Sequence, residues 1–138
     1  MKNTLKIFVI LFLLMNYSCK AQQMVQTAND AHKLKINEQQ FLNKPLKYLL
    51  NEIKPEIKTA FGTVDFPSYF SFRFIDLEEF KSGRAIGKNH LGLYVYVKEP
   101  VEWDFDKRAK DKEFLWTKED VEKYGNLTVI RIRVIGKD

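Results

Sequence analysis

The chain has 138 residues, 45% of them hydrophobic and 30% charged, with a formal charge of +5 at pH 7. This length supports the core of one domain. Cys19 is the only cysteine, which excludes an internal disulfide, and the lack of a basic run argues against nucleic acid as a partner.

Residues 1–18 predict a secretory signal peptide. Lys2 and Lys6 precede the nine apolar residues 7–15, and small residues follow them. Nine apolar residues are too few to span a bilayer, so we expect the segment to be removed when the protein is exported from a bacterial cell. Loss of the two lysines lowers the formal charge to +3.

The end of this segment resembles the lipobox of bacterial lipoproteins. Ser18 and Cys19 follow the apolar run, and Asn16 stands where the family commonly has an aliphatic residue. The resemblance covers residues 1–19 only. It implies that Cys19 is lipidated, becomes the first mature residue and anchors the protein in a cell-envelope membrane. Cleavage after Ala21 is the alternative, and it predicts a soluble periplasmic protein.

After the anchor cysteine, residues 19–31 are mostly polar and lack periodicity, which predicts a flexible tether. Residues 32–138 then predict a single domain. Alternating apolar residues begin near Leu34, and no internal repeat interrupts the sequence that follows.

The clearest helix of this domain is predicted for residues 44–53. Asn43 is a good N-cap, and Pro45 suits the first turn, where its missing N–H has no cost. Pro55 ends the helix, because the residue before a proline avoids the helical conformation. One apolar face is formed by Leu42, Leu46, Leu49, Leu50 and Ile53.

Three strands are predicted from alternating residues, at 69–75, 91–98 and 127–135. Such alternation buries one side of the sheet and leaves the other facing water or a ligand. Residues 34–36 and 57–61 are candidates for edge strands. In the last strand we expect one side to be formed by Thr128, Ile130, Ile132 and Val134.

A second, short helix is predicted for residues 118–124, between Thr117 as N-cap and Gly125 as C-cap. It leads directly into the last strand. The order of elements predicts an α+β fold in a single small domain. We expect a mostly antiparallel sheet of three to five strands, packed on one main helix.

The polar side of the predicted sheet is the first candidate binding surface. If the three strands are neighbours, the shared side chains are Arg73, Tyr94, Tyr96, Arg131 and Arg133. Tyrosine stacks on sugar rings, and arginine forms paired hydrogen bonds with carboxylate or phosphate. An anionic glycan or the acidic loop of an envelope protein would suit such a surface. The alternative is an ordinary exposed sheet face stabilised by cross-strand pairs.

The segment 99–116 is the second candidate. It contains six acidic and four basic residues, with Trp103 and Trp116 near its ends. Long loops of mixed charge with tryptophans often bind partners, so Trp103 is a candidate ligand-binding residue. The alternative is a solvated loop held in place by buried tryptophans.

No pattern in the chain predicts an enzyme, a metal site or a cofactor. Histidines, cysteine and carboxylates lack the spacing of a zinc site, and no serine lies in a recognisable nucleophile motif. A dispersed triad of His90 with Ser68, Ser71 or Ser82 stays open as an alternative.

The sequence therefore predicts a membrane-tethered, non-enzymatic interaction domain of the cell envelope, without fixing its ligand. The body of the chain resembles small exported bacterial proteins, and that resemblance implies no activity. Two alternatives from other classes stay open: a periplasmic inhibitor of a secreted hydrolase, and a small hydrolase with a dispersed site.

Overall fold

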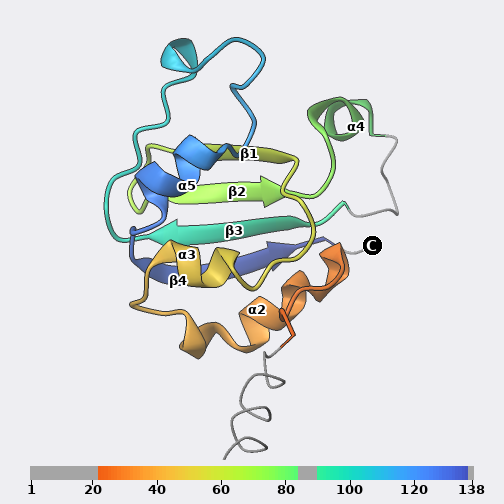
Figure 1. The fold of residues 1–138 in the computed structure, drawn as a ribbon, viewed down its shortest axis with the longest axis vertical. Helices are drawn as coiled ribbons and strands as arrows, with labels where there is room; N and C mark the ends of the chain where they lie inside the picture. The colour runs from red at the N-terminus through yellow and green to blue at the C-terminus, as the bar shows by residue number, and fades with distance from the viewer. Residues whose placement is uncertain (1–21, 84–89, 137–138) are drawn as a thin grey trace, which may run out of the picture.

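The structure, a computed structural model, describes residues 22–83 and 90–136. Its centre is one antiparallel sheet whose strands lie side by side in chain order (Figure 1). The strands are β1 (Thr59–Thr63), β2 (Tyr69–Arg73), β3 (Gly92–Val97) and β4 (Val129–Ile135). The predicted α+β class and antiparallel sheet are confirmed.

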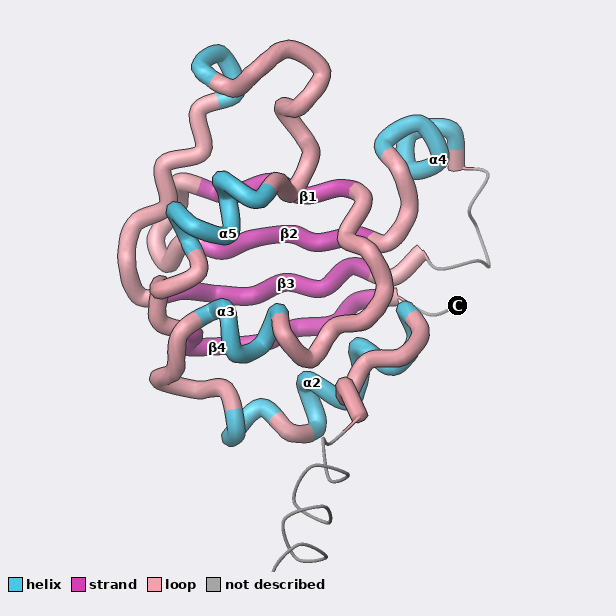
Figure 2. The backbone as a smooth tube through the Cα atoms, viewed as in Figure 1, coloured by secondary structure: helices cyan, strands magenta, loops and turns pink. Residues whose placement is uncertain are grey.

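Short helices lie across one face of this sheet (Figure 2). Together they cover the face that the sequence predicts to be covered by one main helix. They are α2 (His32–Ile36), α3 (Leu46–Leu50) and α5 (Lys118–Tyr124). Phe70 and Phe72 of β2 are fully buried beneath them, and the edges of both rings meet Trp116. The core therefore lies between the helices and one side of the sheet.

The helix α3 is shorter than the predicted 44–53. It begins after Pro45, because the chain just before it pairs with the segment that leads into β4. The N–H of Val129 donates to the Lys44 carbonyl at 3.0 Å, and the N–H of Leu46 donates to the Leu127 carbonyl at 2.8 Å. Asn43 has a φ of 64° and is not the N-cap. Tertiary hydrogen bonds therefore determine where this helix starts.

Residues 22–31 are packed into the domain and do not form the flexible tether that the sequence predicts. Val25 is fully buried and forms a parallel bridge with Ile53. The short 3-10 helix η1 (Ala28–Ala31) buries both of its end residues. The predicted edge strand at 34–36 is also wrong, since these residues belong to α2.

A bulge changes which residues of β4 point toward the core, compared with the prediction. The register shifts between Tyr96 and Val97, so that Val97 pairs with Val129. Val129 and Ile132 are consequently buried, and Ile130, which the alternation places on the core side, is 36% exposed. Alternation along one strand does not reveal such an inserted residue.

The helix α5 is confirmed at its predicted bounds. Thr117 is its N-cap, and Asp120 completes a capping box with it. The helix α4 (Leu77–Ser82) is not predicted; Asp76 caps it by accepting a hydrogen bond from the Glu79 N–H at 2.8 Å. A 3-10 turn, η3 (Phe105–Lys107), lies in the segment that projects beyond β1 (Figure 1).

The predicted signal peptide, its two cleavage sites and Cys19 lie outside the described residues. Within residues 22–83 and 90–136, no helix has the length and hydrophobicity needed to cross a bilayer.

Candidate functional site

The strand pairing brings all five predicted sheet residues onto one face, opposite α2, α3 and α5. Tyr94 lies opposite Arg133, and Tyr96 lies opposite Arg131. In the neighbouring pair of strands, Tyr69 lies opposite Tyr96, and Arg73 is on the same side of β2 as Tyr69. We call these six residues the open face: Tyr69, Arg73, Tyr94, Tyr96, Arg131 and Arg133.

Tyr94 is held against the backbone of its own strand. A Cβ added to Gly92 would lie 2.9 Å from Cε2 of the Tyr94 ring, so the ring occupies the space that any other side chain at position 92 would need. This placement brings the Tyr94 hydroxyl to 2.9 Å from Nη2 of Arg73, which donates to it. The glycine thereby sets the direction of the ring.

Arg73 is fixed from a second side by α4. Its guanidinium carbon lies 4.3 Å from the centre of the Phe80 ring, a distance typical of a cation–π contact. Phe80 in turn stacks on His90. Arg73 is therefore a positioned cation at one end of the open face.

Tyr69 links the three tyrosines of the open face, because its ring contacts those of Tyr94 and Tyr96. The ring centres of Tyr69 and Tyr96 are 4.9 Å apart, and Tyr69 meets Tyr94 edge-on at 6.0 Å. Arg131 lies with its guanidinium carbon 5.4 Å from the centre of the Tyr96 ring. The result is a continuous aromatic patch across β2 and β3, with cations beside it.

The charge of the open face has one sign. The strand positions on this side of the sheet hold three arginines and no acidic residue. Among the described residues, no ion pair involves Arg73, Arg131 or Arg133. Arg131 and Arg133 are exposed.

Two polar atoms on this side of β2 are left unused by the fold. Oγ of Ser71 and Nε of Arg73 are buried and have no hydrogen-bond partner in the described part of the chain. Most buried polar atoms in native proteins are paired, so each unpaired atom calls for an explanation.

Trp103 does not join the open face. It is 3% exposed and packs against Gly62, Tyr124 and Trp116 on the helix-covered side of the sheet. Arg108 lies over it, with the guanidinium carbon 3.7 Å from the ring centre. The structure therefore agrees with the alternative interpretation, in which buried tryptophans hold a charged loop.

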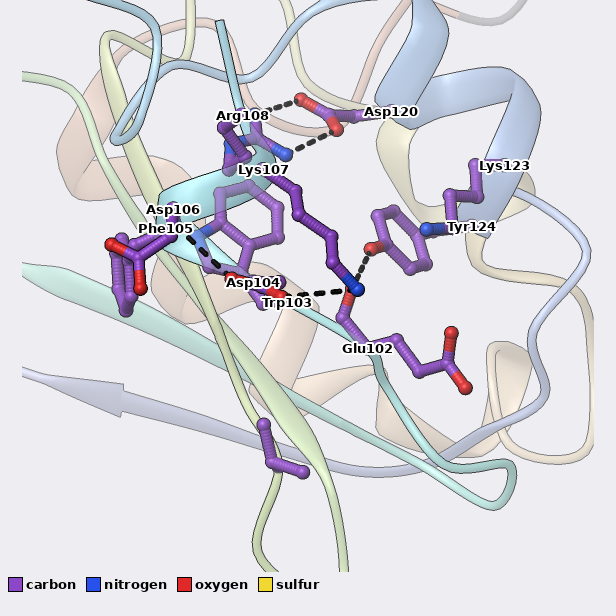
Figure 3. Close-up of a pocket in the computed structure, with 11 residues that line it drawn as sticks. Glu102, Trp103, Asp104, Phe105, Asp106, Lys107, Arg108, Asp120, Lys123 and Tyr124 are labelled. Carbon is purple, nitrogen blue, oxygen red and sulfur yellow. Dashed lines mark hydrogen bonds and ion pairs between the residues drawn. The ribbon is translucent and has the colours of Figure 1, made fainter. Parts of the chain in front are cut away.

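Arg108 and Asp120 form the contact that fastens this loop to α5 (Figure 3). Two hydrogen bonds join them, from Nη1 to Oδ1 at 2.9 Å and from Nη2 to Oδ2 at 2.8 Å. Both side chains are largely buried. Thr117 donates to Oδ2 of Asp120 through its N–H and its hydroxyl, each at 2.9 Å.

The protonation of this pair follows from its contacts. Burial raises the pKa of Asp120, but the hydrogen bonds from Arg108 and Thr117 outweigh burial and hold that pKa below its ordinary value. The hydrogen bond to Asp120 raises the pKa of Arg108. Both groups are therefore charged near neutral pH, as a structural ion pair requires.

Comparison of the chain with protein-family models, curated proteins and solved structures gives no match.

A hollow of about 730 Å³ lies beside the Arg108–Asp120 pair, between Val64, residues 102–108 and the end of α5 (Figure 3). Five of its seven charged side chains contact each other or a neighbouring ring; these five are Asp104, Lys107, Arg108, Asp120 and Lys123. Lys107 lies 3.5 Å from the Asp104 carboxylate, and Lys123 lies over the Tyr124 ring. In the described residues, no three acidic, histidine or cysteine side chains are grouped to hold a metal ion. The hollow is thus a weaker candidate than the open face.

The hydrolase alternative gains no geometric support from the described residues. The hydroxyl of Ser68 donates to the Asp65 carbonyl and accepts from the Val101 N–H, so it serves the backbone. Nδ1 of His90 is buried without a partner, and its ring stacks on Phe80. Among the described residues, no hydrogen bond joins this histidine to Ser68 or Ser71.

Sequence reasoning identified five of the six residues of the open face and missed Tyr69. The sequence does contain the pattern that places Tyr69 on this face. Tyr69 lies two residues before Ser71 and four before Arg73, so strand alternation points it to the same side of the sheet. Gly92 was also missed as the residue that admits the Tyr94 ring. That role depends on a close contact, which no sequence pattern encodes.

Proposed function

We propose that this protein is a non-enzymatic binding domain of the bacterial cell envelope, tethered through a lipid on Cys19, that holds an anionic partner on its open face. The observation that carries the proposal is the composition of this face: three arginines and three tyrosines on neighbouring strands, with no acidic residue at the strand positions of this side. Guanidinium groups pair with carboxylates and phosphates through two parallel hydrogen bonds.

Cross-strand contacts account for the tyrosines, but they do not balance the charge of this face. Opposite charges in cross-strand pairs stabilise an exposed sheet face, whereas here Arg131 and Arg133 lie opposite tyrosines and have no acid beside them on the sheet. The exposed Arg131 and Arg133 have no ion-pair partner in the described part of the chain. An anionic partner would supply the missing counter-charge.

The first experiment measures binding of the mature chain to dextran sulfate, a simple polyanion, by calorimetry. We expect the double variant Arg131→Gln/Arg133→Gln to bind roughly 3- to 10-fold more weakly, because each exposed ionic contact contributes up to about 1 kcal/mol. Lys47→Gln/Lys118→Gln is the matched control, since it removes the same charge from exposed residues of α3 and α5. Equal weakening in both variants would contradict a role for the open face.

The tether is tested separately by the intact mass of the native protein from membrane and soluble fractions. A chain that begins at Cys19 with added acyl mass supports the tether. An unlipidated soluble chain that begins at Gln22 contradicts it and leaves the anion-binding surface to be judged on the calorimetry.

A further inference from the structure

The proposed function does not specify the class of anion that binds the open face. The arrangement of the tyrosine rings favours one class. Tyr94 lies along the sheet surface over Gly92, and Tyr69 touches both Tyr94 and Tyr96. All three tyrosines are partly exposed. They present adjoining aromatic surface rather than isolated side chains.

The cations lie around this aromatic patch on two sides. Arg131 and Arg133 are two residues apart on β4, which spaces their Cα atoms by about 6–7 Å along the strand. Arg73 lies on β2, two strands away, at a lateral distance of about 10 Å. A ligand that lies on the tyrosines therefore has a guanidinium within reach at either side.

Around the three tyrosines, this face offers side chains and little main chain. The strands β2 and β3 are paired on both sides, so their N–H and carbonyl groups are engaged in the sheet. Extended peptides are usually held by a free strand edge or a groove, where main-chain hydrogen bonds contribute affinity. Rings stacked on tyrosine need no such main-chain partners.

We propose that the ligand of the open face is an acidic polysaccharide whose carboxylate-bearing sugar rings lie on Tyr69, Tyr94 and Tyr96. The carboxylates of the sugar pair with Arg131, Arg133 and Arg73. The tyrosine hydroxyls are donors and acceptors for sugar hydroxyls. This inference rests on the proposed function and specifies its ligand class.

The test uses the mature chain and three polymer probes in affinity gel electrophoresis: polygalacturonate, poly-L-glutamate at the same carboxylate concentration, and uncharged dextran. We expect polygalacturonate to retard the protein at a concentration about 10-fold lower than poly-L-glutamate needs, because only the sugar polymer can use the rings. Dextran is expected to retard it least, because it offers the arginines no charge.

Two variants separate the rings from the charges. Tyr96→Leu is expected to weaken polygalacturonate binding about 3- to 10-fold, the range of an aromatic contact worth about 0.5–1.5 kcal/mol, and to leave poly-L-glutamate binding unchanged. Arg131→Gln is expected to weaken both. Tyr48→Leu is the matched control, because Tyr48 is an exposed tyrosine of α3 on the helix side. Thermal unfolding checks that each variant is folded.

The outcomes are distinguishable. Equal binding of the two polyanions, with no effect of Tyr96→Leu, would overturn the polysaccharide and favour an acidic protein segment, while the anion-binding proposal stands. Failure of both polyanions to bind would overturn the anion-binding proposal and the polysaccharide together.

Discussion

Asp120 has two structural roles, and both depend on the charge of its carboxylate. It completes the capping box of α5 and it receives the two hydrogen bonds from Arg108 that hold the 104–116 loop over Trp103. A buried charge that loses its partner is costly, so the pair is expected to be more important for stability than an exposed ion pair.

Asp120→Asn is expected to lower the free energy of unfolding by about 3 kcal/mol near pH 7, because the isosteric amide leaves the largely buried Arg108 without a counter-charge. The folded-state pKa of Asp120 is lowered, so its contribution is present above the unfolded value of about 3.9 and is lost as pH falls through the folded value. Urea titrations between pH 2 and pH 7 should therefore show the wild type and the variant converging in acid.

Asp106→Asn is the control for this acid dependence, because Asp106 is an exposed carboxylate of the same loop. A stability gap between wild type and Asp120→Asn that stays constant down to pH 2 would show that the charge of Asp120 is not what matters.

Gly92→Ala is expected to destabilise the protein by about 1–3 kcal/mol, because the new Cβ meets the Tyr94 ring at 2.9 Å and forces it to move. A double-mutant cycle with Tyr94→Leu identifies the cause. If the ring is the obstacle, Gly92→Ala should lower the free energy of unfolding less in the Tyr94→Leu background than in the wild type. An equal loss of unfolding free energy in both backgrounds would assign the effect to the backbone.

Among the elements, those with local signals were predicted best. The helix α5 has its N-cap, capping box and C-cap residue within nine residues of sequence, and its bounds agree with the structure. The start of α3 depends on hydrogen bonds with the chain before β4, and the facing of Val129 depends on a bulge against β3. Both are tertiary effects, and a sequence pattern cannot supply them. The strand residues of the open face were predictable because alternation is local.

Thr117→Ala tests how far α5 depends on its local signal. Loss of the hydroxyl removes the cap on the Asp120 N–H at 3.2 Å and one donor to the Asp120 carboxylate, so we expect a loss of about 1–2 kcal/mol. Thr117→Ser keeps the hydroxyl and is expected to stay within about 0.5 kcal/mol of wild type in the same urea titration. Comparable losses in the two variants would argue against the cap.

At the scale of the whole molecule, the N-terminal residues belong to the fold. The Val25 N–H donates to the Glu52 carbonyl, and the Val25 carbonyl accepts from Lys54, both at 2.9 Å. The packing of this segment could not be predicted from the polar composition of residues 20–31, because one buried valine and two buried alanines give no periodic pattern.

Val25→Ala is therefore expected to lower the unfolding free energy by about 1.5–3 kcal/mol, as for a buried aliphatic side chain that loses its packing. Val64→Ala is the control, since Val64 is 69% exposed and should change stability by less than about 0.5 kcal/mol. A Val25 variant as stable as the Val64 variant would contradict the packing of this segment.

In the proposed lipidated form, the burial of Val25 would limit the distance between the folded domain and the lipid on Cys19. Five residues lie between the two positions, and the six residue steps from Cys19 to Val25 reach about 20 Å when the chain is fully extended. A domain on so short a linker stays beside the bilayer surface, where the local concentration of membrane-associated polymers is high. A lipidated form would therefore meet partners in that thin layer and could not reach across the envelope to distant ones.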